Sequence, residues 1–271
     1  MSVVLLDGPV GTELLARGVA TPLPGWSAHA IDDAPEVLRD IHGGYAEAGA
    51  DVHTANTFRT RQRQFPDRWR ELTRRAVELT REGIGGSAGR VAGSIAPIED
   101  CYAPHLSPAE PRPEHREMAR ALADADVDLM LVETFPHVGE ALVAVEEAVE
   151  TGKPTWVSFT AGPAADLLTV DEIRAGAERA VSIGAEAVLV NCVPTRRTEE
   201  FLRAIEGLGV PFGAYANAGR ADPEVGFSAD PASCAEYVAA ARVWVDLGAS
   251  IVGGCCGTGV AQIRDLAREF K

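Results

Sequence analysis

The sequence predicts an α/β protein that folds as a single (β/α)8 TIM barrel, and three observations lead to this prediction. Short apolar runs alternate with longer amphipathic stretches from end to end, which is typical of repeated strand–helix units around a parallel sheet. Eight such units can be counted in the 271 residues. No low-complexity linker divides them, so residues 1–271 are expected to form one barrel domain. The alternative is an open doubly wound sheet, which usually has about six or seven units.

The apolar runs that we expect to form strands are short, as strands buried on both faces usually are. They comprise residues 3–6, 51–54, 90–93, 129–132, 155–159, 187–190, 211–215 and 250–252. The stretches expected to form helices lie between and after them, at residues 35–48, 67–81, 113–125, 139–150, 170–183, 198–208, 232–247 and 260–270.

Several of these helices carry start or stop signals. Pro113 stands where a proline is tolerated in a first turn, and Thr198 precedes Glu200 and an apolar run. Four glycines follow helices as left-handed caps do: Gly49, Gly152, Gly184 and Gly248. The longest irregular stretches, residues 21–35 and 95–113, follow early strands, and we expect them to fold over the mouth of the barrel.

Charge and composition exclude some classes of partner. The formal net charge of -15 argues against a nucleic-acid partner, since such proteins concentrate positive charge against phosphates. One basic stretch, residues 59–75, is interpreted as the solvated face of a helix. The N-terminal residues have no basic region and only a short apolar run, so neither a secretory signal nor a membrane anchor is expected. The five cysteines show no disulfide spacing, which favours a reducing, cytoplasmic location.

Polar residues that directly follow the apolar runs are candidates for an active site. The carboxyl ends of barrel strands meet at one mouth, where catalytic residues gather. Asp7 follows the first run, Glu133 the fourth, Asn191 and Cys192 the sixth, and the pair Cys255 and Cys256 the eighth. We therefore expect these side chains to face one cavity.

Three of these residues, Cys192, Cys255 and Cys256, form a candidate zinc site with an open fourth position, as in catalytic zinc sites. Cys192 and Cys255 are 63 residues apart, so only the closed barrel can bring them together. Four glycines around the cysteine pair, at positions 253, 254, 257 and 259, are expected to let the backbone turn so that both sulfurs meet one ion. Two alternatives stay open: a vicinal redox disulfide, and a phosphate site made by the glycine-rich loop before the last helix.

The acidic residues at the mouth suggest an amino-acid substrate. Two carboxylates, Asp7 and Glu133, suit an ammonium group, although they also suit a second cation or a general acid. Backbone N–H groups around Gly8, Gly11 and Thr12 are expected to receive the substrate carboxylate. For Asp7 the simpler alternative is that it only caps the following turn. No catalytic residue beyond the zinc site is predicted, and His53 is expected to be a core residue.

With these motifs in place, the sequence resembles the homocysteine S-methyltransferase family. The most specific matches are Val-Asn-Cys at residues 190–192 and Ile-Val-Gly-Gly-Cys-Cys-Gly-Thr at residues 251–258. Further matching segments extend over nearly the whole chain, at residues 5–14, 48–51, 56–58 and 132–134. Pro9 departs from the pattern, because the family often has glycine or alanine there.

The resemblance implies a homocysteine-binding barrel with zinc on Cys192, Cys255 and Cys256, homocysteine held partly by Asp7 and Glu133, and a role in methionine biosynthesis. Asn217 resembles the asparagine that serves as a labile fourth metal ligand in the cobalamin-dependent branch. Arg59 stands where the betaine-using branch has a tyrosine, which disfavours that branch.

The resemblance leaves the methyl donor open, because the segment Trp-Ser-Ala at residues 26–28 resembles the S-methylmethionine branch, whereas residues 56–58 and 217–219 resemble the cobalamin-dependent branch. We expect zinc-dependent methyl transfer to homocysteine, with S-methylmethionine or S-adenosylmethionine as donor. The alternatives are another small thiol or selenol as acceptor, a homocysteine module that works with a separate cobalamin protein, and a zinc-binding or redox-sensing barrel without turnover. A homo-oligomer is compatible with the sequence, which does not determine the oligomeric state.

Overall fold

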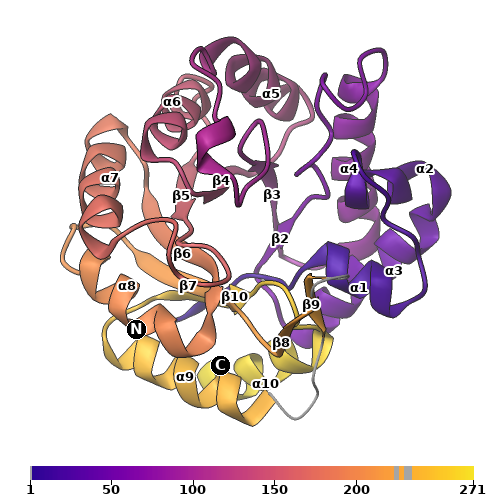
Figure 1. The fold of residues 1–271 in the computed structure, drawn as a ribbon. Coiled ribbons are helices and arrows are strands. Elements are labelled where there is room, and N and C mark those ends of the chain that lie inside the picture. Colours follow the sequence, from indigo (N-terminus) through magenta and orange to yellow (C-terminus); the bar gives the residue numbers. More distant parts are fainter. Residues whose placement is uncertain (1, 223–225, 229–233) are drawn as a thin grey trace.

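Eight parallel strands form the wall of a barrel in the computed structural model, which describes residues 2–222, 226–228 and 234–271. Figure 1 shows the strands at the centre, with the helices around them. The strands are β1 (Val4–Leu5), β2 (Val52–Thr54), β3 (Arg90–Ile95), β4 (Leu129–Phe135), β5 (Thr155–Phe159), β6 (Ala187–Pro194), β7 (Phe212–Asn217) and β10 (Ile251–Gly254). Their order, β1-β10-β7-β6-β5-β4-β3-β2, is that of a (β/α)8 barrel, which confirms the predicted fold class.

Hydrogen bonds between β1 and β2 close the barrel. Leu6 bridges Val52 in parallel, and the Asp7 N–H donates to the Val52 carbonyl at 2.9 Å. The Asp51 N–H donates to the Leu5 carbonyl at 2.7 Å, and the Asp51 carboxylate accepts the Leu5 N–H at 2.8 Å. An open doubly wound sheet has two free edges and is therefore ruled out.

The outer layer contains the predicted helices, three of them with the predicted bounds. The helices of this layer are α3 (Pro35–Ala48), α4 (Trp69–Ile84), α5 (Arg112–Asp124), α6 (Val138–Val149), α7 (Val170–Ile183), α8 (Thr198–Ile205), α9 (Cys234–Asp246) and α10 (Val260–Phe270). The predicted first residues of α9, 232 and 233, lie outside the described residues. No helix within the described residues is long and apolar enough to cross a membrane.

The predicted helix ends are confirmed at the glycines, and α8 begins at Thr198 as predicted, although Thr198 does not cap it. The cap glycines 49, 152, 184 and 248 have positive φ values of 101°, 76°, 127° and 101°, the region in which glycine is favoured. Pro113 lies in the first turn of α5. The Thr198 hydroxyl donates back to the Pro194 carbonyl at 3.1 Å, so it does not cap α8.

The connection after β1 is more helical than its sequence indicates. It contains α1 (Val10–Ala16), the 3-10 helix η1 (Trp26–His29) and α2 (Ala30–Asp33), so the expectation of an irregular stretch at residues 21–35 was wrong. Two further 3-10 helices, η2 (Pro104–Leu106) and η3 (Thr195–Arg197), follow β3 and β6. A hairpin of β8 (Arg220–Asp222) and β9 (Gly226–Ser228) follows β7. These elements are too short to produce a clear hydrophobic period.

Two apolar layers fill the molecule, because successive residues of a strand point to opposite faces. In β4, Leu129 and Leu131 join the cluster inside the barrel, whereas Met130 and Val132 join the cluster between the strands and the helices. The inner cluster also contains Cys192, Tyr215 and Cys255. At the mouth of the barrel, the apolar interior therefore ends in these cysteine side chains and the Tyr215 ring.

The basic stretch at residues 59–75 is only partly a solvated helix face. Its arginines at positions 63, 68, 70, 74 and 75 form ion pairs with nearby carboxylates, as expected for surface side chains. Residues 59–68 precede α4, however, and Arg61 is buried, with its guanidinium donating to the Pro97 and Phe58 carbonyls. Arg61 therefore links the connection that follows β2 to the connection that follows β3.

Candidate active site

The predicted site residues meet at the carboxyl ends of the strands. Asp7 directly follows the last paired residues of β1, but Glu133 and Cys192 lie within β4 and β6, which extend beyond their apolar runs. The charge of Glu133 raises the pKa of Asp7, so the two carboxyl groups lie near each other. Glu133 also raises the pKa of Cys256. The carboxylates and the cysteines therefore share one electrostatic environment.

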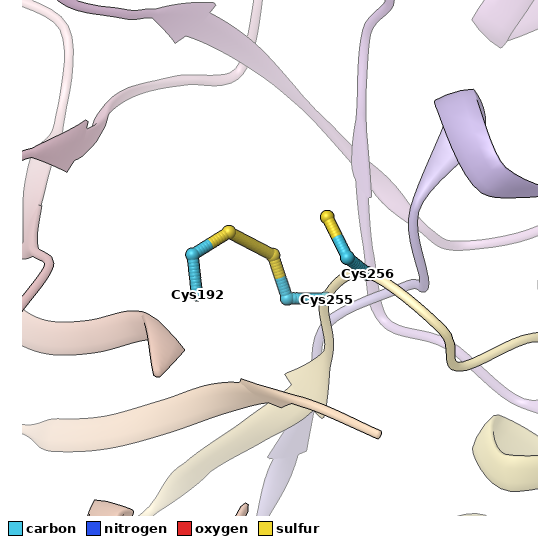
Figure 2. Close-up of side chains that lie close together, drawn as sticks. All are labelled: Cys192, Cys255 and Cys256. Carbon is cyan, nitrogen blue, oxygen red and sulfur yellow. A yellow bond between two sulfur atoms is a disulfide. The ribbon is translucent and has the colours of Figure 1, made fainter. Parts of the chain in front are cut away.

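The three cysteine sulfur atoms lie within 4.8 Å of one another. Figure 2 shows the three side chains grouped together. Cys192 and Cys255 are joined as a disulfide, with 5.8 Å between their Cα atoms, and Cys256 is free. The bond thus joins two strands, and the vicinal disulfide considered from the sequence is not present. In the reduced state, these atoms supply three sulfur donors with room for a fourth ligand, a set that suits zinc.

The chemistry of Cys256 also fits a metal. Burial raises the pKa of its thiol to about 11, so without a nearby cation the thiol stays protonated at neutral pH. A coordinated metal removes that proton, because it stabilises the thiolate directly. The site therefore needs a cation in order to hold thiolates.

The glycines around the cysteine pair have two different roles. Only Gly257 has the left-handed φ, 76°, that a turn requires. Gly254 lies in β10, where an added Cβ would stand 2.1 Å from the Thr258 hydroxyl oxygen, and at Gly253 it would stand 2.5 Å from Leu6 Cβ. The expectation that all four glycines turn the backbone was therefore wrong, because most of them allow close packing instead.

The phosphate alternative has little support from the loop's backbone. The Gly254 N–H donates to the Asp7 carbonyl, and the Cys255 N–H donates to the Ala216 carbonyl. The Thr258 N–H donates to the Cys255 carbonyl at 3.0 Å, and the Gly259 N–H donates to the Gln262 side chain at 3.0 Å. A phosphate cradle needs free N–H groups, and these four are already used.

Asp7 is buried and bridges β1 to β2. Its carboxylate accepts the Thr54 N–H at 2.8 Å and the Thr54 hydroxyl at 3.0 Å. Helix α1 has no side-chain cap, so Asp7 is not the turn cap considered from the sequence. Burial raises the pKa of Asp7 well above its ordinary value, despite the bonds from Thr54. A cationic group beside Asp7 would favour its charged form.

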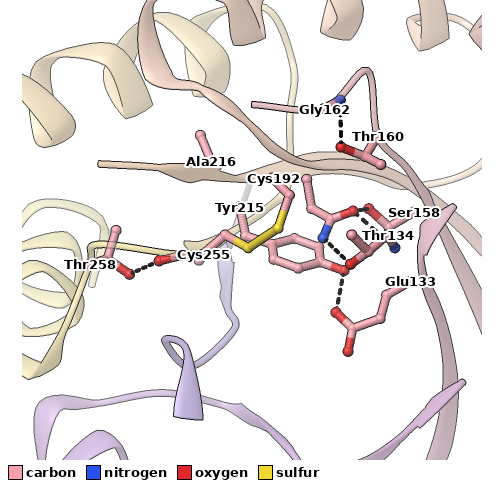
Figure 3. The surroundings of a disulfide bond; sticks show 12 residues. Glu133, Thr134, Ser158, Thr160, Gly162, Cys192, Tyr215, Ala216, Cys255 and Thr258 are labelled. Carbon is pink, nitrogen blue, oxygen red and sulfur yellow. Dashed lines mark hydrogen bonds between the residues drawn. A yellow bond between two sulfur atoms is a disulfide. The ribbon is translucent and has the colours of Figure 1, made fainter. Parts of the chain in front are cut away.

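Glu133 is buried and held by two hydroxyl groups, as Figure 3 shows for Tyr215. Ser94 donates to one carboxylate oxygen at 2.5 Å, and Tyr215 donates to the other at 2.9 Å. Burial raises the pKa of Glu133, and the two donors offset part of that rise. Tyr215 was missed from the sequence because it reads as the last residue of an apolar strand.

The backbone is strained beside both halves of the site. Thr134, after Glu133, has a φ of 61°, and Cys192 has a φ of 52°. Both positions lie at irregularities in strand pairing, in β4 against β5 and in β6 against β7. Residues other than glycine rarely adopt such angles, and they concentrate at functional sites. Nothing in the residue types at 134 and 192 indicates this geometry.

In the connection after β1, Gly8 and Gly11 each pack against an aromatic side chain. An added Cβ at Gly8 would stand 2.5 Å from the Tyr45 hydroxyl oxygen, and at Gly11 it would stand 2.2 Å from the Trp26 ring. Thr12, in the first turn of α1, has a buried hydroxyl without a hydrogen-bond partner. Gly8 and Gly11 are thus explained by packing, whereas the Thr12 hydroxyl is available to a bound molecule.

Asn217, at the end of β7, has the strongest unmet hydrogen-bonding capacity near the cysteines. It is 2% exposed, and neither its side-chain oxygen nor its nitrogen has a partner. The next residue, Ala218, donates its N–H to the Cys256 carbonyl at 2.9 Å. Because a buried amide without partners is costly, an absent ligand is a natural explanation.

Tyr102, in the connection after β3, packs against the inner cluster that contains Cys192 and Cys255, as Cys256 does. Cys256 also raises the pKa of Tyr102, so this part of residues 95–113 lies near the cysteines, in line with its expected position. Trp26, from the first connection, packs edge to face with Phe58, with 6.0 Å between ring centroids. His53 is fully buried in β2, as expected for a core residue.

Comparisons with known proteins point the same way as the geometry. The family model described as homocysteine S-methyltransferase matches residues 4–270. The chain is 30% identical to a homocysteine S-methyltransferase of Escherichia coli (strain K12), over 97% of this chain and 94% of that protein. It is 29% identical to the S-methylmethionine–homocysteine S-methyltransferase BHMT2 of Mus musculus, over 90% of this chain and 72% of that protein.

A solved structure resembles the whole barrel. The metallated form of the homocysteine methyltransferase MmuM from Escherichia coli aligns with a TM-score of 0.82 and 26% identity, covering 99% of this chain and 96% of that chain. The similarity therefore extends over the complete fold rather than over the cysteine motifs alone.

Proposed function

The chain belongs to the homocysteine S-methyltransferase family, and from that premise we propose a zinc-dependent transfer of a methyl group from a sulfonium donor to the homocysteine sulfur. One observation carries the proposal: three cysteine sulfurs from two strands lie within 4.8 Å of one another, in the same environment as two buried carboxylates. Cys192, Cys255 and Cys256 would hold the metal, and Asn217 would supply the oxygen donor that the substrate displaces.

Zinc, when bound, lowers the pKa of a coordinated thiol, so that the sulfur is nucleophilic at neutral pH. Asp7 and Glu133 bind the homocysteine ammonium group and orient the sulfur toward the cysteines. The substrate carboxylate is received at the first loop, by backbone N–H groups near Gly8 and Gly11 and by the free hydroxyl of Thr12. Tyr102, packed against the inner cluster, and Trp26, packed against Gly11, would help to exclude water from the bound substrate.

The chemical step breaks the bond between the donor's methyl carbon and its sulfonium sulfur and forms a bond from that carbon to the homocysteine sulfur. The donor leaves as a neutral thioether, and the product is methionine. S-methylmethionine and S-adenosylmethionine both meet this requirement, whereas betaine would leave as a tertiary amine. The apolar mouth favours the reaction, because it desolvates two charged reactants that become neutral.

A donor panel tests the proposal. Reduced, zinc-loaded protein is mixed with homocysteine and with S-methylmethionine, S-adenosylmethionine or betaine, and methionine is quantified by mass spectrometry. We expect methionine from at least one sulfonium donor, and its loss after chelation and recovery after zinc is restored. Undiminished turnover in the chelated protein, or no methionine from either sulfonium donor, would refute the proposal. Reductant is required because the Cys192–Cys255 disulfide removes two of the sulfur donors.

A further inference from the structure

One buried side chain, that of Asn191, connects the two halves of the site. It is fully buried in β6, next to Cys192. Its side-chain oxygen accepts the Ser158 hydroxyl at 2.8 Å and the Thr134 N–H at 3.2 Å. Its side-chain nitrogen donates to the Thr134 hydroxyl oxygen at 2.7 Å. Both ends of the amide are therefore engaged, which fixes its orientation.

The bonds of Asn191 end at the strained residues. Thr134, which follows Glu133 and has a φ of 61°, takes part in two of the three bonds: its N–H donates one, and its hydroxyl oxygen accepts the other. Asn191 itself is bonded through the main chain to Cys192, whose φ is 52°. Such backbone angles persist only where the surroundings hold them in place. The Asn191 amide thus links the irregular segment of β4 to that of β6.

Tyr215 extends this connection to the Glu133 carboxylate. In the pairing of β6 with β7, Asn191 and Tyr215 are direct partners. The Tyr215 hydroxyl donates to Glu133, and its ring belongs to the same apolar cluster as Cys192 and Cys255. Figure 3 shows Tyr215 between the Cys192–Cys255 disulfide and Glu133. Residues of β6, which carries Cys192, and of the neighbouring strand β7 therefore hold both the Glu133 side chain and the backbone that follows it.

We infer that Asn191 is a positioning residue that couples the metal-binding end of the site, at Cys192, to the ammonium-binding end, at Glu133. It touches neither substrate nor metal, and the inference rests on the proposed function for the role given to Glu133. Loss of the bond from the Asn191 side-chain nitrogen to the Thr134 hydroxyl should therefore weaken both zinc binding and homocysteine binding.

The test uses Thr134→Val, which keeps the side-chain shape and removes the acceptor of the Asn191 nitrogen. Thr134→Ser is the conservative variant, because it keeps the hydroxyl. Thr73→Val, in α4, is the matched control: its buried hydroxyl bonds Thr60 at 2.8 Å, in the outer layer away from the cysteines. For each reduced protein, zinc affinity is measured by chelator competition, homocysteine KM and kcat by methionine formation, and stability by thermal unfolding.

We expect Thr134→Val to raise both the zinc dissociation constant and the homocysteine KM by about tenfold, the effect of one buried donor left unpaired. Thr134→Ser should restore both, and Thr73→Val should lower Tm without changing either. Wild-type zinc affinity and KM in a folded Thr134→Val protein would overturn the inference. Should Thr134→Val not fold, Ser158→Ala removes a different bond of Asn191, and unchanged zinc affinity there would overturn it equally.

The test separates this inference from the proposed function. Zinc affinity is measured without turnover, so a wild-type protein that binds zinc but forms no methionine refutes the function alone. A wild-type protein that forms methionine, with a Thr134→Val variant equal to it in zinc affinity and KM, refutes the coupling alone.

Discussion

At the scale of single residues, the site combines groups that are costly to bury. Asp7 and Glu133 are buried carboxyl groups with raised pKa values, and Cys256 is a thiol whose pKa is raised to about 11. Without a nearby cation, the ionised form of each buried group is less stable than its neutral form. In the proposed function, a bound metal and the substrate ammonium group would be the cations that stabilise these ionised forms.

Cys256→Ala tests the metal-binding role of the free cysteine. Cys256 is only half-buried and at the edge of the inner cluster, so the barrel should survive its loss. We expect zinc affinity to fall by about 100-fold or more, since loss of an outer partner alone costs about 10- to 100-fold. Zinc content and circular dichroism measure the two effects. A collapsed fold would instead show that Cys256 is structural, and Cys101→Ala is the control for loss of a thiol elsewhere.

Glu133→Gln separates the stability and binding effects of one charge. Because the pKa of Glu133 is higher in the folded chain than its ordinary value, its ionised form destabilises the barrel at neutral pH. We expect the variant to have a higher Tm at about pH 7.5 and a homocysteine KM raised by about tenfold, the loss of a charge-assisted bond. As the pH falls through the folded pKa, the wild type takes up the proton, and the stability difference should vanish.

Two measurements decide this prediction. Thermal unfolding across pH follows the stability difference, and initial rates with varied homocysteine give KM. A lower Tm for Glu133→Gln at about pH 7.5 would contradict the argued cost of the charge, and an unchanged KM would contradict its role in binding the ammonium group.

At the scale of elements, the sequence predicts the repeating parts well and the irregular parts poorly. The strands and the outer helices follow from hydrophobic periodicity, and the cap glycines from their conformational freedom. The bend at Thr134 does not follow, because its hydrogen bonds to Asn191 are long-range, and the residue type at Cys192 does not indicate its bend. The role of Tyr215 could not be predicted for the same reason, because its hydrogen-bond partner Glu133 is 82 residues away in the sequence. The convergence of the three cysteines was predictable, whereas the hydrogen bonds around them were not.

Gly254→Ala tests whether the crowding at β10 positions Cys255. The new Cβ would stand 2.1 Å from the Thr258 hydroxyl oxygen, which now donates to the Cys255 carbonyl at 2.8 Å. The strand end must shift, and we expect zinc affinity to fall and stability to drop by roughly 1–3 kcal/mol, the usual cost of overpacking. Gly86→Ala is the control, since a Cβ there meets nothing within 4 Å. Equal zinc affinity in both variants would contradict the prediction.

At the scale of the whole molecule, the site and the outer layer respond to different conditions. The proposed metal binding depends on the redox state of the cysteines, whereas the packing around α3, α4 and β2 depends on buried neutral histidines. Burial lowers the pKa of His42, in α3, to about 3 and that of His53, in β2, to about 4. The His42 ring is near His53 and lies within 3.1 Å of the Thr80 hydroxyl oxygen of α4. These histidines tie the stability of the barrel to pH.

The sign of that dependence follows from which state binds more protons. With an ordinary pKa of 6.5 and a folded pKa of about 3, His42 binds protons in the unfolded chain before it does so in the folded one. Stability from His42 is therefore complete above about pH 6.5 and is lost progressively as the pH falls toward 3. At about pH 5 the loss from His42 alone is about 2 kcal/mol, at ~1.4 kcal/mol per pH unit.

His42→Gln should remove this loss, because glutamine does not titrate and can still bond Thr80. Urea unfolding of metal-free, reduced protein at about pH 7.5 and pH 5 measures it, and the carboxyl groups of the site cancel because both proteins contain them. We expect the wild type to lose about 2 kcal/mol more than His42→Gln between these pH values. Equal losses would show that His42 can take up a proton within the folded barrel, for instance through rearrangement around Thr80, and that acid sensitivity arises elsewhere.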